Sequence, residues 1–359
     1  MKRQEYGSMF DSKKKRAVLI GTITFVILTA ILISFFHHLD RNIFQVLSDT
    51  SLASIFVLIV CGCFYNFFDS CIYKTTFTEL IPGFSFADSV SLTNLRVFGK
   101  TALIAGGAFP LQSYYLYKKG LIVGRCAGIT SALYLIQKVS ILFSSAILLT
   151  AEHQWIGEYS GSVLKYLWIS YPLYFVVIFL LLLFCTSHRV CQLGITLIDK
   201  LPSSGKWPRR KEKWAENLIA LFEEPHVLFR SRKKFFHIIV FTLCRLFVFY
   251  SIPYVCLKLL GTEPYTLLQV QCLTSLMLMI SNVIPNVAGM GAPEVAFMLV
   301  FSESLGSFTT AALVFFRCST YYFPFIISIL FVIIIEKEMA KSKESQILNS
   351  DEHTRRHCN

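Results

Sequence analysis

The chain has 359 residues, is 54% hydrophobic and 16% charged, and carries a formal net charge of +12. Its apolar residues gather in blocks of about 20 or more, the length of helix that crosses the roughly 30 Å hydrocarbon core of a bilayer, which excludes an ordinary water-soluble globular protein. The basic residues flank these blocks, so membrane topology explains the positive charge better than nucleic-acid binding does.

The first membrane half, residues 17–186, follows a basic amino terminus, residues 1–16, that carries six Lys or Arg. Each long apolar block in this half predicts a helix that can span a membrane. The predicted spans are residues 17–36, 52–73, 121–149 and 166–185. Gly and Pro interrupt a further apolar segment, residues 87–116, which we expect to be broken or re-entrant.

The second membrane half, residues 235–335, has three predicted spans and a second interrupted segment. The spans are residues 235–257, 265–284 and 308–335, and the interrupted segment is residues 284–305. If this segment re-enters, the all-α polytopic protein has seven transmembrane helices; if it crosses, there are eight, and the polar tail, residues 336–359, changes side. Interrupted segments at corresponding places of two halves are typical of transporters, whose freed backbone groups line a cavity.

A basic, amphipathic segment, residues 187–234, joins the two halves. Eleven Lys or Arg lie between residues 188 and 234, whereas residues 151–162 contain none. Because basic residues near span ends stay on the cytoplasmic side, we expect a multi-pass protein of the cell membrane with a cytoplasmic amino terminus. The segment is typical of an interfacial helix on anionic lipid, so we expect no direct contact with nucleic acid.

The second interrupted segment places an acidic residue at the start of a helix. Pro285 ends the preceding helix, Gly289 and Gly291 permit backbone angles closed to other residues, and Pro293 fits a first helical turn. Glu294 then lies where free N–H groups and the helix dipole favour a carboxylate. It is either a simple capping residue or part of a site, and the cost of an ionisable group at membrane depth favours a site.

Two cations lie inside predicted spans of the second half. Arg317 is too far from either end of its span for its side chain to reach the membrane surface, so it needs a partner, and Glu294 is the nearest candidate in the sequence. Arg245 is a second buried cation, in span 235–257. A structural ion pair and a ligand contact are both open for each arginine.

The first interrupted segment also combines helix breakers with polar groups. Gly106, Gly107 and Pro110 break the helix, and Gln112 offers both a donor and an acceptor at depth. Tyr114 lies close by and is equally typical of a membrane interface.

Polar residues continue at depth in the neighbouring spans. Gln137 and Lys138 lie in span 121–149, whereas Asp69 is near the inner end of span 52–73, where we expect it to be hydrated. The chain has no metal, nucleotide or nucleophile signature, so we predict no catalytic residue, no metal site and no cofactor.

These motifs resemble the flippase-like transmembrane family typified by the membrane domain of lysylphosphatidylglycerol synthase (phosphatidylglycerol lysyltransferase, or multiple peptide resistance factor). The family's P-x-P-G-G-[LI]-G-x-x-E element is matched by Pro285, Gly289, Met290, Gly291 and Glu294. Its Arg and aromatic-Pro stretch is matched by Arg317, Tyr321 and Pro324. Its Gly-Gly, Pro, Gln, Tyr, Leu, basic pair and Gly, in that order, are matched by Gly106, Gly107, Pro110, Gln112, Tyr114, Leu116, Lys118, Lys119 and Gly120.

The chain departs from the family at two places. Val287 and Ala288 replace the second Pro and first Gly of the first motif, and Gln137-Lys138 stands where the family usually has Glu-Arg. The second change keeps the cation and loses the acid, which weakens any proton or ion-pair role there.

The resemblance implies translocation of an anionic or aminoacylated phospholipid, or of another lipid-linked headgroup. Arg317 and Lys138 would meet phosphate, and Glu294 would balance a cationic headgroup or organise Arg317. In the full-length synthase a cytosolic domain transfers lysine from lysyl-tRNA to phosphatidylglycerol; with 24 residues after the last predicted span, we expect no such domain here. The alternatives are a membrane subunit of a lysyl- or glycosyl-transferring enzyme, whose catalytic domain is on another chain, and a plain scaffold. The lipid and the oligomeric state stay open.

Overall fold

The computed structural model describes residues 50–102, 108–158, 161–200, 207–262, 265–284, 289–335 and 337, and every element in them is helical. The predicted all-α membrane class is confirmed, because four helices are long and apolar enough to cross a bilayer. The basic amino terminus, the predicted span 17–36 and nearly all of the tail lie outside the described residues.

The four candidate spans coincide with predicted ones. They are α3 (Leu52–Phe77), α6 (Val123–Ala151), α11 (Arg232–Leu259) and the continuous helix Gly306–Ile335, which includes α14 (Thr309–Arg317). Two shorter apolar helices, Trp168–Leu183 within α8 (Gly161–Thr186) and α12 (Leu267–Val283), cover predicted spans 166–185 and 265–284. Large apolar side chains are exposed on the spans, as a lipid-facing surface requires.

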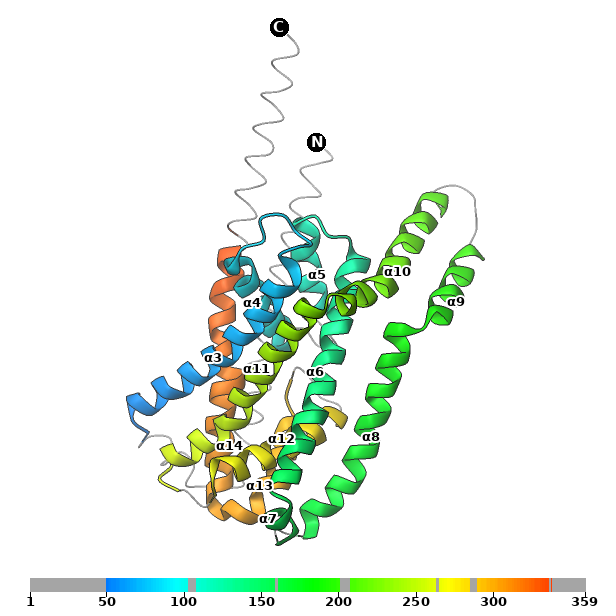
Figure 1. Ribbon diagram of the computed structural model, residues 1–359. Coiled ribbons are helices and arrows are strands. Elements are labelled where there is room, and N and C mark those ends of the chain that lie inside the picture. The colour runs from blue at the N-terminus through cyan, green and yellow to red at the C-terminus, as the bar shows by residue number, and fades with distance from the viewer. Residues whose placement is uncertain are drawn as a thin grey trace.

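The helix α11 is central, because it packs against α3, α6, α12 and α14 (Figure 1). The largest buried apolar cluster joins α11, α12, α14 and α13 (Ala292–Leu305). Within it Phe297 stacks on Phe301 at 4.5 Å and on Phe316 at 5.5 Å between ring centroids. This packing fixes the start of α13 beside α14, which positions the site described below.

In the first interrupted segment, two helices are described. These are α4 (Phe86–Ala102) and α5 (Ala108–Lys118), while Gly106 and Gly107 lie outside the described residues. Pro110, predicted to break a helix, lies in the first turn of α5. There its missing N–H has no partner to lose, so proline is tolerated.

In the second interrupted segment, Pro285 lies outside the described residues, and α13 begins at Ala292 with Pro293 in its first turn. Gly289 and Gly291 have φ angles of 78° and 96°, which L-residues with side chains rarely adopt. These two glycines therefore let the chain turn sharply into α13.

The last span contains a wider, π-helical turn at Cys318–Tyr322. It ends two residues before Pro324, whose ring would clash with the carbonyl four residues back in a regular α-helix. The turn packs closely on α3: a Cβ on Gly62 would lie 2.4 Å from the Ser319 carbonyl oxygen, and the Ser319 hydroxyl donates to the Leu58 carbonyl at 2.8 Å. The π-turn thus accommodates Pro324 within the last span.

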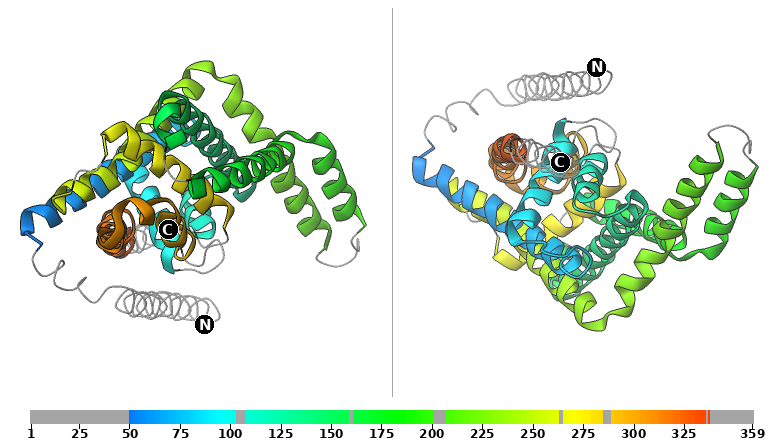
Figure 2. Two further views of the ribbon diagram at one scale, coloured as in Figure 1. Left: turned by 90° about the horizontal axis from the view of Figure 1, so that it is seen from below. Right: turned by 90° about the horizontal axis from the view of Figure 1, so that it is seen from above.

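The basic segment forms two helices, α9 (His188–Asp199) and α10 (Trp207–Arg230), which extend sideways from the bundle (Figure 2). Helix α10 is also bonded to α6. The backbone N–H of Gly124 donates to the Asn217 side chain at 2.7 Å, and Arg125 pairs with Glu224. Hence α10 packs on the bundle.

Candidate functional site

A polar cavity of about 160 Å³ lies among α3, α4, α6, α11, α12 and the last span. Its lining includes Asn66, Arg96, Lys100, Gln137, Asn282 and Arg317. Asn66, Gln137 and Thr320 each lie near the middle of a helix long enough to cross a bilayer. The cavity therefore lies at the depth where a polar group is most costly and needs a structural or functional reason.

Arg317 is held in the wall of this cavity by three contacts. Its Nε lies 2.7 Å from Glu294 Oε1, its Nη2 donates to the Gly289 carbonyl at 2.8 Å, and its guanidinium lies 4.3 Å from the centroid of the Tyr321 ring. Both charged side chains are nearly fully buried, at 6% and 8% exposure. A buried cation with this many partners is fixed in position, which suits a binding group.

Glu294 has two functions at once. Its other oxygen, Oε2, accepts a hydrogen bond of 2.7 Å from the backbone N–H of Gly291, the residue before α13. One carboxylate thus caps the helix and neutralises Arg317. The side chain is thus both the capping residue that the sequence offered as one alternative and the partner expected for Arg317.

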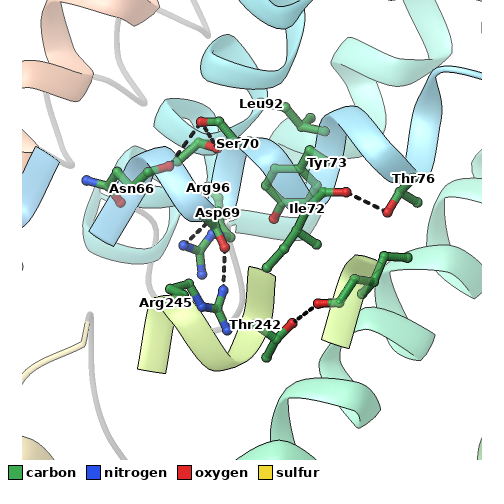
Figure 3. Close-up of polar contacts among 12 residues, drawn as sticks. Asn66, Asp69, Ser70, Ile72, Tyr73, Thr76, Leu92, Arg96, Thr242 and Arg245 are labelled. Carbon is green, nitrogen blue, oxygen red and sulfur yellow. Dashed lines mark hydrogen bonds and ion pairs between the residues drawn. The ribbon is translucent and has the colours of Figure 1, made fainter. Parts of the chain in front are cut away.

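A second charged cluster lies next to the cavity and joins the two halves of the chain (Figure 3). Asp69 on α3 forms an ion pair with Arg245 on α11 and lies 2.6 Å from Nη2 of Arg96 on α4. The Asp69 side chain is only 3% exposed, so the expectation that it is hydrated at the inner end of its span is wrong. Arg96 both belongs to this cluster and lines the cavity.

Two lysines complete the charged environment. Lys138 donates to the Asn282 side chain at 2.7 Å and lies 4.7 Å from the centroid of the Tyr134 ring. Lys100 lines the cavity within electrostatic range of Arg96 and Arg317. Among the described residues, neither lysine has a carboxylate within 4.0 Å.

Four buried polar atoms of the lining have no hydrogen-bond partner within the part of the chain that the structure describes. Nε of Arg317 is one of them, but it is ion-paired with Glu294; the other three are Oδ1 of Asn66, Nε of Arg96 and Nδ2 of Asn282. Buried polar groups are nearly always satisfied, so a cluster of such atoms around one cavity needs an explanation. Two donors and one acceptor on residues that line a cationic cavity could bind a polar ligand.

The sequence-predicted residues divide into two groups. Gln137 and Arg317 line the cavity, Glu294 and Lys138 each contact a lining residue, and Arg245 belongs to the adjoining cluster. Two others lie elsewhere.

Gln112 donates to the Tyr73 hydroxyl at 2.8 Å and to the Leu92 carbonyl at 3.3 Å, so it ties α5 to α3 and α4. Tyr114 is 40% exposed and faces Lys118, 5.8 Å from its ring centroid. Neither side chain lines the cavity.

Sequence reasoning assigned no site role to four lining residues, Asn66, Arg96, Lys100 and Asn282. Each is a polar or charged residue within an apolar segment, and such a position is the feature of the sequence that could have identified it as a site residue.

The sequence matches no known protein-family model and no curated protein. Among the described residues, no group of three or more His, Cys, Asp or Glu side chains could hold a metal ion. The resemblance to the flippase-like family therefore depends on the motifs given above and enters only as support for a proposal.

Proposed function

We propose that the protein moves a lipid with a phosphate-bearing headgroup across the membrane. The observation that carries this proposal is the cavity itself, which is polar, bears several cations and lies at mid-length of helices long enough to span a bilayer. A scaffold would not need charged residues at this depth, because each charge there costs several kcal/mol unless it has partners or a function.

The chemistry of the lining supports a phosphate ligand. Arginine forms bidentate hydrogen bonds with phosphate, and lysine acts as a compact positive charge. Arg317, pre-oriented by Glu294 and Gly289, and Lys138, held by Asn282, would meet the phosphate. Glu294 would then act as a positioning residue for Arg317.

The charge at the helix ends supports the orientation expected from the sequence, in which the amino terminus is cytoplasmic. Basic residues Lys118, Lys119, Arg232, Lys233 and Lys234 lie at the end of α5 and the start of α11. The opposite end includes α7 (His153–Glu158), with Glu152 immediately before it. By the positive-inside rule the basic end would face the cytoplasm of a cell membrane. A headgroup would enter from one of these sides and leave on the other.

Leaflet-resolved lipid analysis tests the proposal. Total and outer-leaflet phospholipids and aminolipids are compared in cells with the wild-type protein, without it, and with Glu294→Gln or Arg317→Ala. At matched amounts of inserted protein, we expect totals to hold while the outer fraction of one lipid falls in the deletion and in both variants.

Glu303→Gln is the matched control, because Glu303 is an exposed acid on the same helix. It should leave the lipid distribution unchanged. Unchanged distribution in all strains would contradict translocation. A fall in the total amount of a lipid would instead place the protein in lipid synthesis, as the membrane subunit of a lipid-modifying enzyme.

A further inference from the structure

The site has more positive charge than its carboxylates can balance. Five basic side chains lie in or beside the cavity, and among the described residues only Asp69 and Glu294 carry the opposite charge there, which leaves a surplus of three. The basic residues are Arg96, Lys100, Lys138, Arg245 and Arg317. The two neighbouring segments outside the described residues, 103–107 and 285–288, contain no Asp or Glu.

The surplus is concentrated where like charges face one another. Lys100 lies within electrostatic range of Arg96 and Arg317, with Glu294 as the one opposite charge in its range among the described residues, and Lys138 lies within range of Lys100. Like charges at such range disfavour one another. An anion between them would remove this repulsion, and a ligand with a single negative charge would remove only part of it.

The unsatisfied donors point to the same place. Nε of Arg96 and Nδ2 of Asn282 are buried donors, and Oδ1 of Asn66 is a buried acceptor, without a hydrogen-bond partner among the described residues, and all three residues line the cavity. A phosphate group would offer acceptor oxygens to the two donors. A cationic amine could donate to Asn66 but would lie beside the three basic lining side chains Arg96, Lys100 and Arg317, which is unfavourable.

The volume limits the size of the headgroup. About 160 Å³ corresponds to roughly five water molecules, well below the roughly 300–1,000 Å³ of drug-sized pockets. A phosphate or diphosphate group is compact, whereas an aminoacyl-glycerol headgroup adds a long cationic arm.

We infer that the cavity binds a compact lipid headgroup with about two or more negative charges, a phosphomonoester or a diphosphate, in preference to a phosphodiester or an aminoacylated phospholipid. The inference rests on the proposed function and narrows its substrate class. A phosphomonoester carries about −1.5 to −2 charges at pH 7, which matches the surplus better than the single charge of a diester does. Lys100 is the residue that would distinguish these ligands most directly.

Thermal unfolding of the full-length protein in detergent micelles tests the inference. The unfolding midpoint, Tm, is followed while micelles are doped with geranylgeranyl diphosphate, phosphatidic acid, phosphatidylglycerol or lysyl-phosphatidylglycerol. Soluble pyrophosphate is added separately. We expect the diphosphate and phosphatidic acid to raise Tm, with half-saturation at least about tenfold lower than for phosphatidylglycerol, since each charge-assisted contact contributes about tenfold or more.

Lys100→Gln distinguishes a ligand-binding role of Lys100 from a structural one, because losing a structural residue would lower the Tm of the ligand-free protein. Removing a cation that repels its neighbours should raise the Tm of the ligand-free protein and weaken diphosphate binding about tenfold. Lys118→Gln is the matched control, because Lys118 is exposed on α5 and does not line the cavity. Lys118→Gln should change neither the Tm of the ligand-free protein nor the affinity for the diphosphate.

The outcomes separate the two proposals. Tightest binding of lysyl-phosphatidylglycerol, or equal binding of all four lipids, would overturn the charge preference and leave translocation standing. Soluble pyrophosphate binding as tightly as geranylgeranyl diphosphate would keep the charge preference and identify a free anion as the ligand. If no lipid raises Tm and leaflet distribution is unchanged on deletion, translocation itself fails.

Discussion

Glu294 and Arg317 form a buried ion pair, 2.7 Å between Oε1 and Nε, that joins the start of α13 to the middle of the last span. The same carboxylate accepts the backbone N–H of Gly291, so the pair is linked to the turn that begins α13. The position of the cation in the cavity wall therefore depends on the helix cap, and a change in one should be measurable in the other.

A double-mutant cycle on this pair tests the coupling. Glu294→Gln and Arg317→Gln should each lower the free energy of unfolding by about 3–5 kcal/mol, because each leaves the other charge buried without a partner. The double variant should lose less than the sum of the two losses. Thermal or denaturant unfolding in detergent measures all three; exact additivity would show that the two side chains act independently. Glu303→Gln should stay within about 0.5 kcal/mol of the wild type.

A second prediction compares a buried ion-pair cluster with a pair in which the carboxylate is exposed. Asp69→Asn should destabilise the protein by about 3–5 kcal/mol or more, because it leaves both Arg96 and Arg245 without their carboxylate. Glu79 also pairs with a basic residue, Lys234, whose side chain is 9% exposed, but the Glu79 side chain is 71% exposed. Glu79→Gln should therefore cost less than Asp69→Asn, because it leaves one cation rather than two without a carboxylate. Equal losses in the two variants, by unfolding in detergent, would contradict the structural role of Asp69.

The lengths of the apolar blocks predicted α3, α6, α11 and the last span closely, because backbone groups in lipid must be satisfied within a helix. The ion pair of Glu294 and Arg317 could also be foreseen, since both charges are near each other in the sequence and both need partners. Local sequence was sufficient for these features.

The Asp69 cluster could not be predicted in the same way. Its carboxylate pairs with Arg245, 176 residues away in the chain, and that contact depends on how α11 packs along α3. Helix periodicity does not specify which helices are neighbours in a bundle. The same limit applies to Lys100 and Asn282, whose common place in the cavity follows from tertiary packing alone.

A third prediction concerns pH and Asp88, in the first turn of α4 and outside the four candidate spans. Burial raises the pKa of this carboxyl, but hydrogen bonds from Lys119, Ser85 and Tyr115 lower it by more, to about 2. Because the pKa is below its ordinary value of 3.8, Asp88 stabilises the folded protein above about pH 4, and this stabilisation is lost as the pH falls towards 2.

Asp88→Asn should therefore cost about 1 kcal/mol at pH 7, the usual contribution of a helix cap, and the difference from the wild type should shrink between pH 4 and 2.5. Unfolding in detergent over this pH range measures it. A difference that stays constant down to pH 2.5 would mean that the charge of Asp88 contributes nothing.

The last prediction separates backbone strain from side-chain packing at the turn before α13. Gly289→Ala and Gly291→Ala should each cost about 1–2 kcal/mol, because both positions have positive φ. Only Gly289 has close neighbours: an added Cβ would lie 3.1 Å from Cε of Lys100 and 3.2 Å from Cε2 of Tyr321. At Gly291 nothing lies within 4 Å of the added atom.

Since Lys100 and Tyr321 both line the cavity, Gly289→Ala should also weaken the binding of geranylgeranyl diphosphate, by about tenfold, whereas Gly291→Ala should lose stability alone. Ligand-induced shifts in Tm, each measured against the variant's own ligand-free Tm, separate the two effects. If both variants bind the lipid as the wild type does, the displaced lysine is not a ligand group. If both lose binding equally, the turn itself, rather than Lys100, shapes the site.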